Sequence, residues 1–511
     1  MKYDNLHMGL KVHAKNNGDK VAVIYENKRY TMKELLERVY IVGNAMMDLG
    51  VKKGDHVILY MRNRLEMIEI FYAISMIGAV VVPINYMVRG KDLVELINSS
   101  DGIFAFIEEE KLPDFEEALP HLEKISGKNS VIIGTNVPGR FINYSSFFIN
   151  PNKNPIEVPV GMNDLAAFIY SSGTTSLPKG IMLTHGALLI RSLRTSVEWR
   201  LNHRDTILIT TPLYHSIGHA KAFSLAIHGC TLVLTREFDP EKTLSLIQNE
   251  KVTYAIFVPT QYHMMLNVPD IEKYDFSSVR LLVSGGAPLL ASTKKKIMEV
   301  FDCEFSEFFG STETGVVVIL RPEDVIRKAK SVGVQAEYAE LRLVDENGND
   351  VGIGEEGEFA VRWGGMFSGY YNLPEETEKA HLDGDWFLLG DMGKQDEDGF
   401  YYLLDRKKDM IISGGVNVYP KDIEEVIYTH DAVLEAAVIG VPDEKWGEKV
   451  KAFVVLKEGA EVDKEELMAY CNEKLAKFQN IKELEFLPSL PRNPSGKILK
   501  RELRKRNKVT Q

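Results

Sequence analysis

DHVILYM (Asp55–Met61), LEMIEIFYAISMIG (Leu65–Gly78) and AVVVPIN (Ala79–Asn85) follow one another closely in the sequence and decide the fold. The outer two are short apolar runs that predict buried strands, and the middle one has the length of a helix. Two strands joined by a helix lie parallel in one sheet. The three segments therefore predict a β–α–β unit and, with it, an α/β fold.

The same alternation continues on both sides of this unit. Upstream, RYTMKELLERVYIVGNAMMDLG (Arg29–Gly50) predicts a helix with Thr31 as its N-cap and Gly50 as its stop. Downstream, VTYAIFVP (Val252–Pro259) and VRLLVSGGAPL (Val279–Leu289) are apolar runs, each followed by a helical pattern. These segments favour further parallel strands covered by helices.

The pattern changes in the last third of the chain. LRLVDENGNDVGIGEEGEFAVRW (Leu341–Trp363) alternates around turn-forming residues and predicts a β-rich region. After Asp405, a basic cluster, a glycine pair and a new helix with Pro420 near its start indicate a domain boundary. The expected division is a large domain over residues 1–404, a hinge at 405–408 and a small α+β domain over 409–511.

Bulk composition excludes several classes of protein. With 511 residues, 45 per cent of them apolar and 26 per cent charged, the chain is long enough for more than one domain and is not extensively disordered. A formal net charge of -12 gives no general attraction for nucleic acid, so a ligand such as ATP needs local cations and backbone amides. Three widely spaced cysteines without a CxxC pair disfavour a disulfide framework or a zinc site and fit a reducing cytoplasm.

Neither the N-terminus nor the most apolar stretch predicts a secreted or membrane protein. The segment Met1–Lys20 contains no apolar core of a signal peptide. The uncharged stretch Ile70–Val88 approaches the length of a membrane span, but Gly78, Pro83 and Asn85 interrupt it. A buried helix followed by a buried strand explains it better, so we expect no integral membrane span.

YSSGTTSLPKG (Tyr170–Gly180) has the composition of a phosphate-binding loop at the end of a strand. Lys179 adds a mobile positive charge, but it precedes a glycine and so does not fit the GxxxxGK[ST] motif of common nucleotidases. An ordinary surface turn is the alternative. Hydroxyls and unobstructed backbone amides for a triphosphate come from Ser172, Gly173, Thr174 and Thr175.

Two further segments carry carboxylates suited to a nucleotide. In FFGSTETG (Phe308–Gly315), Glu313 is a candidate to hold Mg²⁺ on phosphate oxygens, and Phe309 offers a flat face to a base. In WFLLGDMG, Asp391 follows a glycine, which suits a carboxylate held in a turn to accept two ribose hydroxyls. Taken singly, a solvated glutamate and a plain Gly-Asp turn are the alternatives.

A lysine and a histidine are the remaining candidate site residues. In PRNPSGKILK (Pro491–Lys500), Lys497 follows a Ser-Gly turn that aims its ammonium group into a distant cleft, and a basic solvated face is the alternative. In PLYHSIGH (Pro212–His219), the two histidines have no third ligand nearby, which disfavours a metal site. We interpret His215 beside Tyr214 as lining a pocket, with an ordinary loop histidine as the equal alternative.

Taken together and in this order, the motifs resemble those of the adenylate-forming superfamily of acyl-CoA synthetases, acyl-activating luciferases and peptide-synthetase adenylation domains. The resemblance covers nearly the whole chain, from RYTMKELLERV (Arg29–Val39) to PRNPSGKILK. It implies a large N-terminal domain of two α/β sheets and a distorted β-barrel, joined by a hinge to a small α+β C-terminal lid. In this superfamily the lid rotates between two half-reactions.

The resemblance also implies roles for the matched residues. Lys497 resembles the lysine that contacts the carboxylate and the α-phosphate as acyl-AMP forms, where positive charge stabilises the transition state. Lys408 resembles the hinge residue, and Lys497, Lys408 and Glu313 are the expected catalytic residues. Thr174 and Glu313 resemble the magnesium-associated pair. The expected CoA tunnel contains Gly414 and Gly415, and the expected acyl pocket contains Tyr214, His215, Phe308 and Val316. The expected nucleotide-binding residues are Ser172, Gly173, Thr174, Thr175, Lys179, Gly286, Ala287, Pro288, Phe309, Gly310, Thr312, Glu313, Asp391, Arg406, Lys408, Asn417 and Lys497.

Three residues depart from the superfamily pattern. Phe309 stands where tyrosine is common and keeps the ring without the hydroxyl. Phe308 fills a place often held by glycine, and its bulk is expected to shorten the acyl pocket. Leu389 replaces a threonine that commonly precedes the Gly-Asp pair, which removes a secondary contact with the nucleotide.

We therefore expect an ATP-dependent carboxylic acid:CoA ligase that uses ATP, Mg²⁺ and CoA and releases AMP and pyrophosphate. A fatty acid is the favoured substrate, and an aromatic acid is the alternative. The second hypothesis is a stand-alone adenylation enzyme that loads a carrier protein, and the third is a nucleotide-binding regulator without turnover. Expected partners are small molecules rather than nucleic acid, the expected location is the cytoplasm, and a homodimer is left open.

Overall fold

The computed structural model describes residues 5–170, 178–287, 289–414, 416–443, 446–492 and 498–509. Residue contacts divide the chain into two compact units. The first unit comprises Met1–Val325, Ala336–Tyr338 and Trp363–Lys379, and the second comprises Ile326–Gln335, Ala339–Arg362 and Ala380–Gln511. The hinge expected at 405–408 lies within the second unit and stays a prediction.

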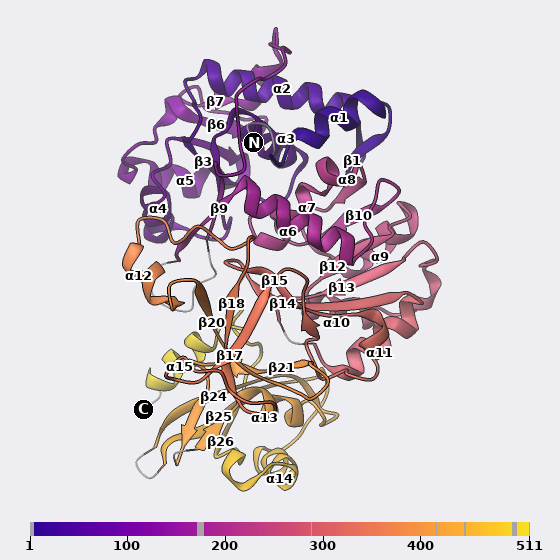
Figure 1. The fold of residues 1–511 in the computed structure, drawn as a ribbon, viewed down its shortest axis with the longest axis vertical. Coiled ribbons are helices and arrows are strands. Elements are labelled where there is room, and N and C mark those ends of the chain that lie inside the picture. Colours follow the sequence, from indigo (N-terminus) through magenta and orange to yellow (C-terminus); the bar gives the residue numbers. More distant parts are fainter. Residues whose placement is uncertain are drawn as a thin grey trace. The chain divides into compact units, whose positions relative to one another are not determined.

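The first unit is a mixed α/β body (Figure 1). Its helices are α1 (Met8–Asn16), α2 (Met32–Asp48), α3 (Leu65–Ile77), α4 (Gly90–Ser99), α5 (Leu112–Ala118), α6 (His185–Glu198), α7 (Ser216–Ala222), α8 (Ser224–His228), α9 (Pro240–Asn249), α10 (Pro259–Leu266), α11 (Ala291–Phe301) and α12 (Pro374–Lys379). Its strands are β1 (Val21–Tyr25), β2 (Lys28–Thr31), β3 (His56–Tyr60), β4 (Val80–Ile84), β5 (Phe104–Glu108), β6 (Ser130–Ile133), β7 (Ile142–Asn143), β8 (Leu165–Tyr170), β9 (Gly180–Thr184), β10 (Thr206–Ile209), β11 (Thr231–Leu234), β12 (Tyr254–Phe257), β13 (Leu281–Ser284), β14 (Glu304–Ser311) and β15 (Gly315–Leu320).

These strands form two sheets that are largely parallel. One runs in the order β7-β6-β5-β3-β4-β8-β9, and the other contains β15-β14-β13-β12-β10-β11-β1-β2. The parallel pairs β3–β4 and β12–β13 confirm the alternation predicted from the sequence. Antiparallel pairs close the edges, among them β8 with β9 and β14 with β15, and the loops of both pairs carry candidate site residues.

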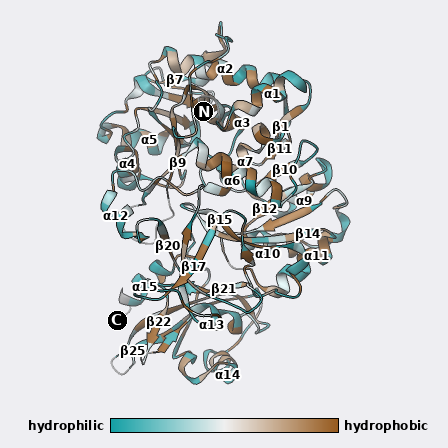
Figure 2. Cartoon of the chain, viewed as in Figure 1, coloured by the Kyte–Doolittle hydropathy of each residue, from teal (hydrophilic) through white to brown (hydrophobic). Residues whose placement is uncertain are grey.

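Local signals place the helices where the sequence predicted them. The hydroxyl of Thr31 accepts a hydrogen bond from the backbone N–H of Glu34, and the Glu34 side chain accepts from Thr31, so a capping box begins α2. Gly50 follows this helix with φ of +93°, a conformation that suits glycine. Figure 2 shows hydrophilic and hydrophobic residues mixed along α1 and α2, as expected for helices that cover a sheet.

The apolar stretch Ile70–Val88 is a buried helix followed by a buried strand, as predicted. Every residue of α3 except Glu66 is buried. Its Tyr72 hydroxyl donates to the carbonyl oxygen of Ala222 at 3.0 Å and accepts from the N–H of Ala226 at 3.2 Å, so α3 also packs against α7 and α8. Among the residues that the structure describes, no helix is long and apolar enough to span a lipid bilayer.

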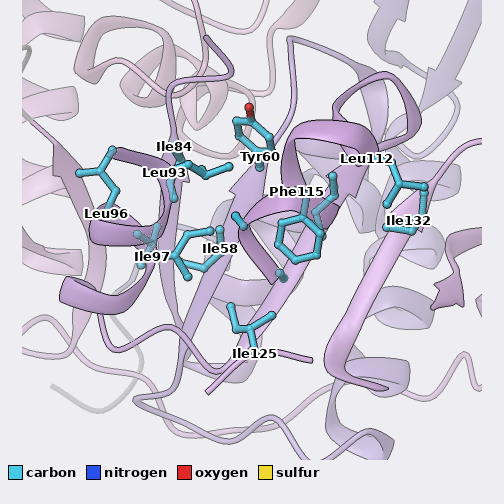
Figure 3. Packing of buried hydrophobic residues seen from close by; sticks show 14 of the residues in the cluster. Ile58, Tyr60, Ile84, Leu93, Leu96, Ile97, Leu112, Phe115, Ile125 and Ile132 are labelled. Atoms are coloured by element: carbon cyan, nitrogen blue, oxygen red, sulfur yellow. The ribbon is translucent and has the colours of Figure 1, made fainter. Parts of the chain in front are cut away.

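One face of the β3–β5 sheet is covered by α4 and α5. Their apolar residues pack on strand residues such as Ile58 and Ile132 (Figure 3). Tyr60 is buried in the same cluster, and its hydroxyl donates to the carbonyl oxygen of Val88 at 2.7 Å. This buried apolar layer stabilises the sheet that carries β8 and the adjoining YSSGTTSLPKG segment.

The second unit combines two smaller sheets. Its elements are β16 (Val334–Gln335), β17 (Glu340–Val344), β18 (Gly357–Arg362), β19 (His381–Leu382), β20 (Trp386–Gln395), β21 (Tyr401–Arg406), β22 (Ile411–Ser413), β23 (Val416–Val418), α13 (Pro420–Ile427), β24 (Val433–Asp443), β25 (Gly447–Leu456), α14 (Lys464–Lys474), β26 (Glu483–Phe486) and α15 (Lys500–Val509). The antiparallel sheet of β17, β18, β19, β20 and β21 confirms the β-rich region. The sheet β23-β22-β25-β24, with β26 beside β25 and helices α13 and α14, has the expected α+β character.

Candidate active site

The segment FFGSTETG forms the end of β14, a tight turn and the start of β15. The backbone N–H of Ser311 donates to Oγ1 of Thr314 at 3.0 Å, and the N–H of Thr314 donates to Oγ of Ser311 at 3.3 Å. A β-carbon on Gly310 would lie 1.9 Å from the carbonyl oxygen of Gly315, so no larger residue fits there. The turn therefore fixes the backbone at Glu313.

A buried arginine of α6 holds this turn from behind. The guanidinium of Arg191 donates to the carbonyl oxygens of Thr312, at 2.9 Å, and of Glu313 and Gly365. Burial lowers the pKa of Arg191 to about 9. No sequence motif marked Arg191, although its spacing from Leu188 and Thr195 places it on the buried face of α6.

Glu313 and Lys179 are connected through Tyr370, which no sequence motif marked either. The Tyr370 hydroxyl donates to Oε1 of Glu313 at 3.0 Å. Nζ of Lys179 lies 4.7 Å from the centre of the Tyr370 ring and 2.8 Å from Oε2 of Glu376. Burial, followed by the charge of Glu313, raises the pKa of Tyr370, so the phenol keeps its proton. The structure thus brings two predicted site residues from distant segments together.

Replacing Tyr370 by Phe tests whether this hydroxyl positions Glu313. A hydrogen bond to a charged group contributes about 1.5–3 kcal/mol, so we expect kcat/KM for ATP–pyrophosphate exchange to fall roughly tenfold or more. This loss of kcat/KM should become smaller as the Mg²⁺ concentration is raised. Tyr371→Phe is the matched control, because the neighbouring hydroxyl donates instead to Oδ2 of Asp101 at 2.7 Å. Equal losses in both variants would contradict the positioning role.

Three predicted segments, the turn at Glu313 among them, meet at the start of α7. Oγ1 of Thr312 donates to Oγ of Ser216 at 3.4 Å. A β-carbon on Gly286 would lie 3.8 Å from Cδ1 of Ile217, which places the Gly286–Ala287 loop beside the same helix. His215 precedes Ser216 as the N-cap residue of α7. The predicted nucleotide loop and the turn at Glu313 therefore meet at the residues that follow Tyr214.

Aromatic side chains contact two residues of the predicted acyl pocket, Tyr214 and Phe308. The Tyr214 ring is buried and meets Tyr86 edge-on, with ring centres 5.9 Å apart. The Phe308 ring lies over Gly285, where a β-carbon would come within 2.3 Å of it, and Phe308 also contacts Trp199. Val316 pairs with Gly310 across β14 and β15. The bulk of Phe308 thus occupies space that only glycine leaves free at position 285.

Part of the predicted site lies outside the described residues. The metal pair is half described, because Glu313 is placed and Thr174 is not. Among the described residues, no cluster of three or more His, Cys, Asp or Glu side chains forms a metal site. The predicted residues outside the description are Ser172, Gly173, Thr174, Thr175, Pro288, Gly415 and Lys497.

The second unit contains Asp391, which is predicted to accept the ribose hydroxyls, and Arg406, another predicted nucleotide-binding residue. Asp391 and Arg406 are paired across β20 and β21, and Nε of Arg406 lies 2.8 Å from Oδ1 of Asp391. Asp391 is only 5% exposed. The preceding Gly390, with φ of +73°, donates its N–H to Glu358, which in turn pairs with Lys407 at 2.9 Å. These contacts hold the Asp391 carboxylate in a fixed direction.

The predicted hinge residue Lys408 is exposed in a turn that follows β21. Backbone N–H groups of Asp409 and Met410 donate to the carbonyl oxygen of Arg406 and form this turn. Gly414 has φ of +61°, and a β-carbon there would lie 2.9 Å from the Trp446 ring. Asn417 is exposed on β23, opposite Ile412.

Two family models match the chain. One, described as an AMP-binding enzyme, matches residues 10–371, and the other, described as the AMP-binding enzyme C-terminal domain, matches residues 422–497. The chain belongs to the family of AMP-binding enzymes. This assignment confirms the resemblance to the adenylate-forming superfamily that the motifs predicted.

Relatives of this AMP-binding enzyme match it over nearly their whole length. It is 35% identical to a feruloyl-CoA synthase of an Amycolatopsis species, over 95% of both chains. It is 32% identical to the fatty acid–[acyl-carrier-protein] ligase ScoC of Streptomyces coeruleorubidus, over 97% of this chain and 95% of the relative. A long-chain-fatty-acid–CoA ligase of Bacillus subtilis is 31% identical over 95% of this chain and 91% of its own.

Solved structures confirm the fold of this AMP-binding enzyme. ATP-bound MatB from Rhodopseudomonas palustris superposes with a TM-score of 0.89 at 29% identity, over 99% of both chains. The anthranilate CoA ligase AuaEII in complex with anthranoyl-AMP gives a TM-score of 0.93 at 27% identity, over 100% of this chain and 98% of that one. The predicted α/β architecture with a small C-terminal domain is therefore correct.

Proposed function

We propose that this AMP-binding enzyme is an ATP-dependent carboxylic acid:CoA ligase. In the first half-reaction a carboxylate oxygen attacks the α-phosphorus of ATP, an acyl-AMP forms and pyrophosphate leaves. In the second, the thiol of CoA attacks the acyl carbonyl, loses its proton and displaces AMP. The observation that carries the proposal is the assembly of Lys179, Tyr370, Glu313 and the start of α7 in one place.

We propose the following roles for the described residues. Glu313, whose Oε1 already accepts from Tyr370, suits Mg²⁺ carried by ATP, because magnesium commonly takes one or two carboxylates and completes its shell with phosphate oxygens and water. The ion supplies charge neutralisation on the phosphates. The Gly286–Ala287 loop and Phe309 are proposed to contact adenine, and Asp391 to accept the ribose hydroxyls.

Other proposed roles rest on the sequence motifs. Lys497 is proposed to contact the reacting carboxylate and α-phosphate, and Lys408 to act as the hinge. Gly414, Gly415 and Asn417 are proposed to lie along the path of CoA and nucleotide after lid rotation. The phosphate contacts are proposed for Ser172, Gly173, Thr174, Thr175, Lys179, Gly310 and Thr312, with Pro288 closing the adenine loop.

The acyl substrate is proposed from the pocket residues and the relatives. The sequence favours a fatty acid, and relatives named for fatty-acid ligation support this class. An aromatic acid is the second candidate, supported by the aromatic side chains of Tyr214, Phe308 and Trp199 and by the relative named feruloyl-CoA synthase. The relative named for ligation to an acyl carrier protein keeps a carrier acceptor as the alternative to CoA.

A pyrophosphate-release screen tests the proposal. Purified enzyme is given ATP, Mg²⁺ and short, medium, long-chain or aromatic acids, with and without CoA. Acid-dependent pyrophosphate release together with CoA-dependent AMP and thioester formation is expected. AMP release that requires an acyl carrier protein in place of CoA would favour the alternative acceptor. Absence of pyrophosphate with every acid would refute the ligase assignment.

A further inference from the structure

A buried lysine lies at the far end of α7 from the turn that holds Glu313. Lys221 is only 9% exposed, and its Nζ lies 4.9 Å from the ring centre of Trp199 and 5.3 Å from that of Tyr254. Within the described part of the chain, its ammonium group has neither a carboxylate at ion-pair distance nor a hydrogen-bond acceptor. Burial lowers the pKa of Lys221 to about 8, which still leaves the amine mostly protonated at neutral pH.

The two rings around Lys221 carry unsatisfied donors of their own. The indole N–H of Trp199 and the hydroxyl of Tyr254 are buried without a hydrogen-bond partner among the described residues. The two rings are tilted by 37° with centres 5.9 Å apart. The Lys221 ammonium therefore packs on two rings whose own donors have no acceptor among the described residues, and an unpaired buried donor destabilises the folded state.

The titratable neighbours of Lys221 include one buried carboxylate, Asp205, which acts on Cys230, His228 and Tyr254 and is paired with Arg280 at 3.2 Å. Burial raises the pKa of Cys230 to about 12, so its thiol stays neutral. Burial, followed by the charge of Lys221, lowers the pKa of His228 to about 4, so its ring is neutral too. A cation–π contact compensates only part of the desolvation of an ammonium group, so packing alone does not account for a lysine here.

The donor cluster Lys221–Trp199–Tyr254 adjoins the proposed acyl pocket. Ring centres of Trp199 and Phe308 are 5.9 Å apart. At the other end of α7, Ser216 contacts Thr312 beside Glu313. A helix rises about 1.5 Å per residue, so Ser216 and Lys221 are separated by about 7.5 Å along the axis. This span fits an aromatic ring with a short side chain or a medium-chain dicarboxylate.

We propose that Lys221, Trp199 and Tyr254 bind an oxygen acceptor at the far end of the acyl substrate. The acid would then carry a second carboxylate or a phenolic oxygen, opposite the carboxyl group that is adenylated. Anionic oxygen satisfies the ammonium charge and the two neutral donors at once. A plain alkyl or phenyl end leaves all three unpaired, which is the type of mismatch that discriminates strongly between substrates. This inference rests on the proposed ligase activity.

Matched acid pairs test the inference in the full-length enzyme. Octanedioate is compared with octanoate, and 4-hydroxycinnamate with cinnamate, by pyrophosphate release with ATP and Mg²⁺. We expect the oxygen-bearing member of at least one pair to have a kcat/KM higher by about tenfold or more. The dicarboxylate pair reports on a second carboxylate and the cinnamate pair on a phenolic oxygen. Equal kcat/KM within both pairs would overturn the inference while leaving the ligase assignment intact.

Two variants separate recognition from folding. Lys221→Met should lower kcat/KM for the preferred oxygen-bearing acid by about tenfold or more and change kcat/KM for the acid without that oxygen by less than about threefold. It should also raise the melting temperature of the enzyme without substrate, because a buried charge is removed. Tyr262→Phe is the control, since that buried hydroxyl donates to the carbonyl oxygen of Val283 at 3.0 Å, away from the cluster. It should lower the melting temperature and leave the ratio within each pair unchanged. Equal losses on both acids with Lys221→Met would contradict the inference, whereas pyrophosphate from neither acid would sink the ligase assignment itself.

Discussion

Lys497→Ala is expected to lower the rate of acyl-AMP formation by about 10²–10³-fold or more, the usual contribution of one charge contact made in the transition state. Its ammonium group is proposed to meet the negative charge that develops as the carboxylate attacks and pyrophosphate leaves. The second half-reaction does not need this contact. Thioester formation from supplied acyl-AMP and CoA should therefore proceed at close to the rate of the unchanged enzyme.

ATP–pyrophosphate exchange and thioester formation from supplied acyl-AMP measure the two steps separately. Lys505→Ala is the control, because Lys505 belongs to the same basic C-terminal segment, is exposed and pairs with Glu502 at 3.1 Å. If the segment is only a solvated basic face, both lysine variants should retain exchange activity. A Lys497 variant that loses both half-reactions equally would also contradict the assigned role.

Arg191→Met is expected to have the largest effect among the described residues. Methionine fills much of the volume but leaves the carbonyl oxygens of Thr312, Glu313 and Gly365 without their shared donor. An unsatisfied buried polar group costs about 1–3 kcal/mol, so the free energy of unfolding should fall by roughly 3 kcal/mol or more. Adenylation should be lost with it, because the turn no longer fixes Glu313.

Chemical denaturation and pyrophosphate exchange measure these two effects. Arg191→Lys keeps the charge but not the fork of donors, so it should recover part of the stability and little of the activity. Arg200→Met is the control, because Arg200 follows α6, is exposed and pairs with Glu304 at the surface. A surface ion pair contributes about 0–1 kcal/mol. A similar loss of stability in Arg191→Met and Arg200→Met would show that the turn does not depend on Arg191.

Much of the fold follows from local sequence signals. The N-cap at Thr31, the glycine stop at Gly50 and the short β-branched runs act over a few residues, and the structure confirms each of them. The largely apolar α3 was also predictable as buried. Its contact with Ala222 was not, because no local pattern specifies which distant segment covers a helix.

In the candidate site, too, residues within short motifs could be predicted, whereas residues that act through contacts distant in sequence could not. Glu313, Gly286 and Asp391 could be predicted as site residues because short motifs surround them, and their roles stay predictions. Arg191 and Tyr370 were missed because their roles arise from contacts across more than fifty residues of sequence, such as Tyr370 with Glu313. The sequence did contain one sign of the role of Arg191, because a charged residue at a position on the buried face of a helix needs buried partners. The hinge and the lysine of the PSGK segment stay predictions.

The burial of α3 on all sides has a consequence for how the chain is synthesised. Its outer surface is covered only when α7 and α8, about 140 residues later, have left the ribosome. Until then the nascent N-terminal half exposes the apolar surface of α3, which binds chaperones or other nascent chains. Fragments that end before residue 216 should therefore be insoluble, and splitting the gene between these helices should yield two halves that must be co-expressed.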